Sequence, residues 1–215
     1  MPDGSPPKRQ QQQQQQQAGG SRESIWVGVR IRPHSELELQ NREQVAWQAA
    51  DDRTLRSADR SNVQQPMAFC FNRIFPPEAS SEQVYQGAAR ERVASAMAGL
   101  NATIFVYGQT GSGKTFTMRS IVQKAAREVF RIIEGQQSRE YLLRASAVEI
   151  YNEKVRDLFR EGTERQNLLL QDDPERGTIV DGAVEEGISS MEQLSQLLHV
   201  IEERRMVGVM LQISF

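Results

Sequence analysis

The sequence predicts an α/β layered domain with a phosphate-binding loop at its centre. Two observations support this prediction. Segments with the two-residue period of a strand alternate along the chain with segments that have the period of a helix. A complete G-x-x-x-x-G-K-T sequence joins one predicted strand to one predicted helix. With 215 residues, of which 38% are hydrophobic, the chain is long enough to form one domain with a substantial core.

Composition argues against several function classes. A formal net charge of -2 does not suit a nucleic-acid binder held mainly by phosphate neutralisation. The single cysteine, Cys70, permits no internal disulfide and indicates a reducing compartment; we interpret it as a small buried apolar residue. We expect neither a zinc site nor a membrane span, because the chain has 2 histidines, 1 cysteine and no apolar run of about 20 residues. Without an apolar signal core, we expect it in the cytoplasm, including the cytoskeleton.

The chain opens with a segment of different composition. Residues 1–22 contain two adjacent prolines and an unbroken glutamine run, Gln10–Gln17. Such a composition buries too little apolar surface to offset the entropy of ordering. We therefore predict a disordered tail.

The first ordered element is a predicted strand. Apolar residues alternate with others along Ile25–Ile31, and Pro33 closes the segment. A polar, weakly patterned stretch follows, and it ends in a short apolar run, Phe69–Phe71. The sequence thus predicts one strand, followed by a polar stretch with little regular pattern.

A helix and a second strand are predicted before the phosphate loop. Ser80 and Gln83 have the spacing of a capping box. They open one helix that we expect to carry Tyr85 and Leu100 on its apolar face. Thr103–Tyr107 is too short for a helix and rich in strand formers, so it predicts the strand that enters the loop.

Four further signals follow the loop. The pattern predicts a helix over Lys114–Ile133 and a strand, buried on both faces, over Leu142–Tyr151. Asp181-Gly182 between two apolar pairs predicts a hairpin. Ser189 with Glu192 predicts a second capping box before the last helix. No sustained heptads indicate a coiled coil, so we expect no coiled-coil dimerisation in this chain.

The phosphate loop carries the clearest chemistry. Its glycines let the backbone curl so that successive N–H groups converge on phosphate oxygens, and the helix that follows presents its positive end to the same anion. Lys114 would neutralise the β- and γ-phosphates, and the Thr115 hydroxyl would ligate Mg²⁺. A chance match in a flexible glycine loop is the alternative, and the strand–loop–helix context argues against it. The predicted ATP-binding residues are Gly108, Gln109, Thr110, Gly111, Ser112, Gly113, Lys114 and Thr115.

The wider run Asn101–Met118 resembles the N-G-T-I-F-A-Y-G-Q-T-x-S-G-K-T-x-T-M signature of the kinesin motor family. Three further segments resemble that family's motifs, in the family's order. Arg30–Pro33 is similar to its R-x-R-P, Phe71–Tyr85 to its F-x-x-V-F and V-Y pair, and Val148–Leu158 to its E-I-Y-N-E-x-V-x-D-L-L block. The resemblance implies a kinesin-type P-loop NTPase core, a central mixed sheet flanked by helices. Details including Leu168–Gly182 most resemble the plant centromere-associated (CENP-E-like) class.

This resemblance implies a microtubule motor that uses ATP or ADP with Mg²⁺ and has tubulin as its partner. It assigns Arg30, Arg32 and Pro33 to the wall of an adenine pocket, with the Tyr85 ring packing on the base. From the residues alone, other interpretations stay open. Two arginines near a strand end usually form a solvated edge, and a tyrosine on an apolar helix face usually belongs to the core. We interpret Tyr151–Glu153 as structural.

The resemblance covers residues 23–208 as the N-terminal part of a kinesin motor domain, and residues 209–215 diverge. In the family, the segment similar to Glu203–Gly208 leads into an N-x-x-S-S-R-S-H loop, and a D-x-x-G-x-E loop follows later. The 215 residues contain neither of these γ-phosphate switches. We therefore expect the C-terminal half of the motor core to be missing, ATP hydrolysis and movement to be lost, and microtubule binding to be weakened or lost.

Folding of the isolated chain is also at issue. In the kinesin sheet, the strand similar to Thr103–Tyr107 lies between strands of that second half, so we expect unpaired groups on both of its edges. Each buried N–H or C=O group without a hydrogen bond costs about 1–3 kcal/mol of folding free energy. The total stability of a domain is only about 5–15 kcal/mol. We expect the chain alone to be aggregation-prone or chaperone-bound. Two alternatives to a motor remain: a non-motile protein that holds nucleotide without turnover, and a non-enzymatic interaction fragment.

Overall fold

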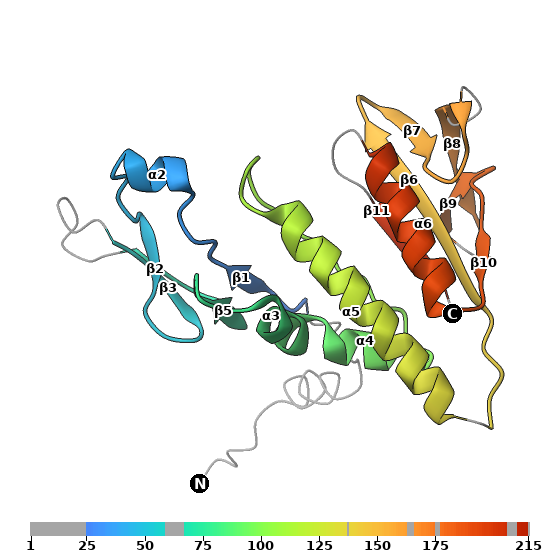
Figure 1. Ribbon diagram of the computed structural model, residues 1–215, viewed down its shortest axis with the longest axis horizontal. Helices are drawn as coiled ribbons and strands as arrows, with labels where there is room; N and C mark the ends of the chain where they lie inside the picture. The colour runs from blue at the N-terminus through green and yellow to red at the C-terminus, as the bar shows by residue number, and fades with distance from the viewer. Residues whose placement is uncertain are drawn as a thin grey trace, which may run out of the picture.

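The computed structural model describes residues 25–58, 67–136, 138–162, 166–174, 177–205 and 210–214. Within them a long helix, α5 (Lys114–Gly135), runs between a small group of N-terminal strands and a larger antiparallel sheet (Figure 1). This helix confirms the prediction over residues 114–133. The tail predicted for residues 1–22, and the predicted boundary between residues 208 and 209, lie outside the described residues.

Two small sheets form the N-terminal part. β1 (Gly28–Arg30) lies parallel to β5 (Arg73–Phe75). β1 is shorter than the predicted strand because Ile25 and Val27 are 80% and 43% exposed, so the alternating residues before Gly28 have no core to face. Cys70 is exposed, not buried as expected, because it ends the edge strand of an antiparallel sheet. The remaining elements here are α2 (Glu36–Gln40), β2 (Trp47–Ala49), β3 (Thr54–Ser57) and β4 (Ala68–Cys70).

The helix predicted after Ser80 is divided into two. Its capping box is confirmed: the Ser80 hydroxyl accepts the Gln83 N–H at 3.2 Å, and the Gln83 side chain accepts the Ser80 N–H at 2.8 Å. The first helix, α3, spans Ser81–Ala88, and α4 spans Arg90–Met97. The break lies at Ala89, where φ is -116° and ψ is -36°. Ala89 is completely buried, so both helices still face one core.

The strand predicted at Thr103–Tyr107 does not form. After Gly99, whose φ of 99° ends the helical path, residues 100–109 adopt neither helix nor strand. Leu100, expected on the apolar helix face, is 64% exposed. No described strand forms ladder hydrogen bonds with residues 103–107. The side chains of Phe105 and Tyr107 are 76% and 94% exposed. The prediction was wrong because strand propensity favours an extended backbone, whereas a β-ladder also requires a partner.

The larger sheet is built on β6 (Leu143–Tyr151), which confirms the strand predicted over residues 142–151. Because Ala145 pairs with both Glu186 and Ile213, β10 and β11 lie on opposite edges of β6. The helix α6 packs on this sheet and lies beside α5 (Figure 1). The other elements are β7 (Lys154–Asp157), β8 (Gln166–Asp173), β9 (Gly177–Asp181), β10 (Glu186–Ile188), α6 (Met191–Arg204) and β11 (Met210–Ser214).

Two turn predictions need correction. Gly182 does form a turn, with φ of 74°, but no strand follows at residues 183–185; β9 pairs with β8, and β10 pairs with β6. The cap of α6 lies one residue later than predicted. The Ser190 hydroxyl accepts the Gln193 N–H at 3.1 Å, while the Ser189 N–H donates to the Gln193 side chain at 2.9 Å. The pair of serines therefore shares the capping role expected of Ser189 alone.

The segment Tyr151–Glu153 forms the turn between β6 and β7. Asn152 and Glu153 have φ of 49° and 61°, the left-handed pair of a two-residue hairpin. Beyond this hairpin Asp157 is completely buried, and its carboxylate accepts the N–H groups of Phe159 and Val184 at 2.8 and 2.7 Å. Asp157 therefore holds the end of β7 against the chain entering β10.

Candidate functional site

The phosphate loop has the backbone that its glycines predict. Gly111 and Gly113 have φ of 79° and 90°, a region that strains any residue with a Cβ atom. A Cβ placed on Gly108 would lie 2.5 Å from the Ser112 hydroxyl oxygen. A side chain at position 108 would therefore force the Ser112 hydroxyl to move, and the other two positions favour glycine by their conformation. α5 begins immediately afterwards, at Lys114.

The start of α5 is open to an anion. Its N-cap residue, Gly113, makes no side-chain cap hydrogen bond, and its first turn has no acidic residue. In contrast, α2, α3 and α6 are each capped by a serine side chain and carry glutamate in the first turn. The first N–H groups of α5 thus keep their hydrogen-bonding capacity, and the positive end of the helix is not neutralised. This is the local arrangement that binds phosphate in proteins.

Lys114 and Thr115 place a cation and a hydroxyl at this helix end. The Lys114 ammonium donates to the carbonyl oxygens of Gly108 and Gln109 at 2.8 and 2.9 Å, so it closes the loop on itself. Thr115 is exposed, and in the described part of the chain its hydroxyl has no hydrogen-bond partner. A hard oxygen ligand next to a phosphate site suits Mg²⁺. The described residues contain no cluster of three or more His, Cys, Asp or Glu side chains that could hold a metal by themselves.

The residues assigned to an adenine pocket fall into two groups. Arg30 lies at the loop helix: its guanidinium donates to the Thr117 hydroxyl at 3.1 Å and to the Ser81 hydroxyl at 3.3 Å. Arg32 instead binds the Glu38 carboxylate and donates to the Pro33 carbonyl oxygen at 2.9 Å. These contacts place the end of β1 near the start of α5, whereas Arg32 is held against α2.

Tyr85 lies elsewhere. It is 2% exposed and belongs to the main hydrophobic core, together with Ala89 and Val93. Burial raises the pKa of Tyr85 to about 12. A ring in this position presents no face on which a base could stack. In the structure Tyr85 is therefore a core residue, as the residue pattern alone suggested.

An aromatic residue that the sequence analysis did not single out lies at the site. Phe116, in the first turn of α5, is 65% exposed, and the Arg30 guanidinium lies 5.1 Å from the centre of its ring. The sequence offered only its place two residues after Lys114. In the structure the buried positions of α5 begin at Thr117 and Ile121, which leaves the ring at position 116 off the core face. An exposed ring two residues after the phosphate-loop lysine is a candidate to contact a base.

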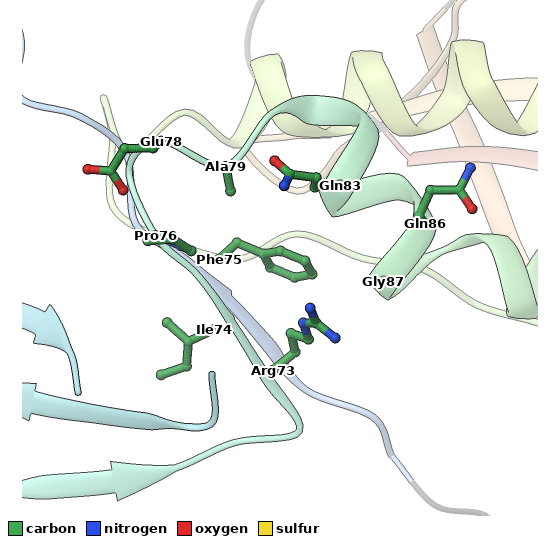
Figure 2. Close-up of a pocket in the computed structure, with 9 residues that line it drawn as sticks. All are labelled: Arg73, Ile74, Phe75, Pro76, Glu78, Ala79, Gln83, Gln86 and Gly87. Carbon is green, nitrogen blue, oxygen red and sulfur yellow. The ribbon is translucent and has the colours of Figure 1, made fainter. Parts of the chain in front are cut away.

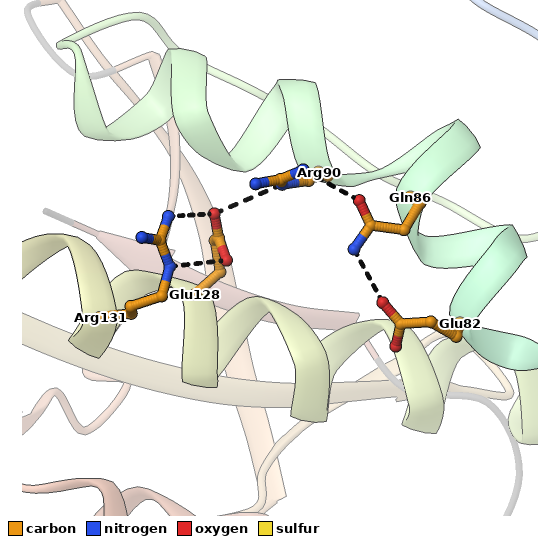
Figure 3. A network of polar contacts seen from close by, with 5 residues as sticks. All are labelled: Glu82, Gln86, Arg90, Glu128 and Arg131. Atoms are coloured by element: carbon orange, nitrogen blue, oxygen red, sulfur yellow. Dashed lines mark hydrogen bonds and ion pairs between the residues drawn. The ribbon is translucent and has the colours of Figure 1, made fainter.

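A polar network holds α5 against α3 and α4 (Figure 3). Gln86 donates to Glu82 at 2.7 Å, and Arg90 donates to Gln86 at 3.1 Å. Arg90 also lies 3.5 Å from the Glu128 carboxylate, to which Arg131 donates at 2.8 Å. The guanidinium of Arg131 lowers the pKa of Glu128. The network joins the body of α5 to the helices that precede the loop.

Two cavities in the described part of the chain do not include the phosphate loop. One, of about 420 Å³, lies between β5 and α3 and is lined by residues such as Phe75, Gln83 and Gln86 (Figure 2). The other, of about 440 Å³, lies at the far end of α5, beside Phe130 and Tyr141. Residues 108–115 are exposed or half-buried, so the candidate site lies at the surface. None of the described helices is long and apolar enough to cross a membrane.

An α/β arrangement in which a glycine loop with this lysine opens a long helix defines a P-loop nucleotide-binding core. The kinesin motor domain model matches residues 30–210. The chain therefore belongs to the kinesin motor domain family, a family of microtubule motor proteins.

Individual relatives agree with this assignment. Kinesin-like protein KIN-7A of Oryza sativa subsp. japonica is 44% identical over 187 residues, which are 86% of this chain and 19% of that protein. KIN-7B of Arabidopsis thaliana is 41% identical over 87% of this chain and 20% of its own length. NACK1 of Nicotiana tabacum is 42% identical over 88% of this chain and 20% of its own. These plant proteins confirm the predicted family, and the CENP-E-like subclass stays a prediction.

A solved structure of a fast kinesin, described with implications for ATPase mechanism and interactions with microtubules, matches with a TM-score of 0.76 and 26% sequence identity. The match covers 84% of this chain and 53% of that chain. It confirms the predicted kinesin-type core. The chain thus spans about half of the solved motor chain, and about a fifth of the length of the curated relatives it matches.

Proposed function

We propose that this chain binds ATP or ADP, with Mg²⁺, at residues 108–115. The observation that carries the proposal is the start of α5, where two left-handed glycines precede an uncapped first turn without acidic residues. Lys114 adds a positive charge that already lies across the loop. Backbone N–H groups, helix dipole and ammonium all favour the same ligand, a polyphosphate.

The metal and the base have separate contacts in this proposal. Thr115 would supply a hydroxyl ligand to Mg²⁺, which neutralises phosphate charge when bound. Phe116 would contact the base, with Arg30, Arg32 and Pro33 on the side of β1. We leave Tyr85 out of this pocket, because its side chain is 2% exposed.

At the level of the longer kinesin chains, we propose that these residues are the nucleotide-binding part of a microtubule motor. Hydrolysis and movement need groups that place water and respond to the γ-phosphate. The 215 residues contain neither of the two family motifs for these tasks. For this chain alone we therefore propose nucleotide binding with little or no turnover. A non-motile nucleotide-binding role is the second candidate, and it rests on the same loop.

Lys114→Ala tests the proposal. The chain is purified as a fusion with a soluble carrier protein, and a fluorescent ADP analogue is titrated with Mg²⁺ and with excess chelator. We expect saturable, Mg²⁺-dependent binding that Lys114→Ala weakens about ten- to a hundredfold, because a hydrogen bond to a charged group contributes about 1.5–3 kcal/mol. Lys154→Ala is the matched control, since Lys154 is exposed on β7, away from the loop. Equal binding by wild type and Lys114→Ala would refute the assignment.

The motor part of the proposal has its own measurement. Phosphate release from ATP is followed with and without microtubules, using the same fusion protein. We expect no microtubule stimulation from these 215 residues. A stimulated rate that Lys114→Ala abolishes would contradict the expected loss of turnover and support a complete catalytic cycle in this chain.

A further inference from the structure

The first two turns of α5 have little apolar anchorage. Among residues 114–120 only Thr117 is buried, and the apolar core positions of the helix begin at Ile121 and continue with Ala126 and Val129. The part of the helix that ends in the phosphate loop therefore depends on polar contacts for its orientation. A helix held only at its far end is free to fray at the other.

Two arginines make such contacts, one with β1 and one with α6. Arg30 reaches the Thr117 hydroxyl from β1. From the second turn of α5, Arg119 donates through Nε and Nη2 to both carboxylate oxygens of Glu202 on α6. This two-point contact fixes the relative rotation of the helices as well as their distance, as bidentate arginine–carboxylate pairs do. α5 and α6 lie beside each other (Figure 1).

The last turn of α6, which carries Glu202, is anchored by apolar and polar contacts. Ile201, the preceding residue, is 5% exposed and packs in the core between α6 and β6. At the end of α6, the Arg204 guanidinium donates to the carbonyl oxygens of Leu158 and Phe159, both at 3.0 Å. Glu202 therefore stands on a fixed support. The Arg119 guanidinium lowers the pKa of Glu202, so the carboxylate is charged at neutral pH.

We propose that Glu202 is a positioning residue for the phosphate loop, acting through Arg119. It does not touch the nucleotide; it holds the first turns of α5 in the orientation that aims their N–H groups at phosphate. This inference rests on the proposed nucleotide binding. It adds a contact between α5 and α6 that neither the phosphate-loop motif nor the periodicity of α6 indicates.

Glu202→Gln tests the inference by removing the charge at constant shape. Glu203→Gln is the matched control, because Glu203 is the next residue on α6, is exposed, and has its carboxylate 3.2 Å from the His199 ring. In titrations with fluorescent ADP and Mg²⁺, we expect Glu202→Gln to weaken binding about two- to fivefold, the range for a partly exposed charged pair. Glu203→Gln should bind like wild type. The double reversal Arg119→Glu with Glu202→Arg should restore binding to within about twofold, which a loss of general stability would not predict.

Equal affinities of the Glu202→Gln and Glu203→Gln proteins would overturn the inference, as would a loss that the reversed pair fails to restore. Amide hydrogen exchange separates this outcome from a failure of the proposed function. Even if the wild-type chain bound no nucleotide, Glu202→Gln should still speed exchange in residues 114–120 about two- to fivefold relative to Glu203→Gln. Unchanged exchange there would refute the positioning role directly.

Discussion

Replacing Gly113 by alanine changes the phosphate loop without touching any neighbour. Gly113 has φ of 90°, and a Cβ built on it would meet no heavy atom within 4 Å. The cost is therefore conformational: a left-handed backbone costs a residue with a Cβ about 1–2 kcal/mol. In the free protein the loop would leave this conformation, and the binding-competent fraction would fall about 5- to 30-fold. Apparent nucleotide affinity should fall by the same factor.

Gly135→Ala is the matched control for this experiment. Gly135 ends the same helix, is not in the left-handed region, and likewise has no heavy atom within 4 Å of a built Cβ. Alanine there should leave nucleotide affinity unchanged and stabilise the fold by up to about 1 kcal/mol. Titration with fluorescent ADP measures the affinities, and urea unfolding measures the stabilities.

The outcomes separate clearly. If Gly113→Ala bound nucleotide as tightly as wild type, the left-handed turn before α5 would not be required for binding, and the argument from loop geometry would fail. If Gly135→Ala lost as much affinity as Gly113→Ala, the effect would belong to the helix as a whole and not to the loop.

Two further predictions concern stability. The basic side chains hydrogen-bonded to Glu82 and Glu128 lower the pKa values of these two carboxyl groups. Their stabilising contribution is therefore complete above the ordinary carboxylate pKa of about 4.3 and is lost as the pH falls through the lower folded pKa values. The urea midpoint of the wild-type chain should fall from pH 7 to pH 3, and that of Glu128→Gln should fall less steeply. Replacing the exposed Phe105 and Tyr107 by serine should raise the soluble fraction of the chain and leave its urea midpoint unchanged. Ile104→Ser removes a core contact and should lower the urea midpoint. Equal effects of the two changes on the midpoint would contradict the exposure seen in residues 100–109.

Local signals in the sequence located much of this structure. The capping box at Ser80, the start of α5 at Lys114 and the long strand β6 lie where the patterns predict them. Each depends on residues a few positions apart, because a cap, a helix start or an alternating strand is stabilised by contacts that the segment itself specifies. The same holds for the left-handed glycines of the loop, where a missing Cβ determines the backbone.

Tertiary contacts decided the rest. Thr103–Tyr107 has the composition of a strand, yet it remains unpaired within the described residues, because a ladder depends on a second segment. Tyr85 is in the core and Phe116 is at the loop, since burial depends on which helices pack together. The link from Glu202 to the start of α5 joins residues 83 positions apart. The sequence alone determined the family, the phosphate loop and the onset of its helix; only the tertiary structure decided which side chains support that loop, because support comes from segments that meet in space and not along the chain.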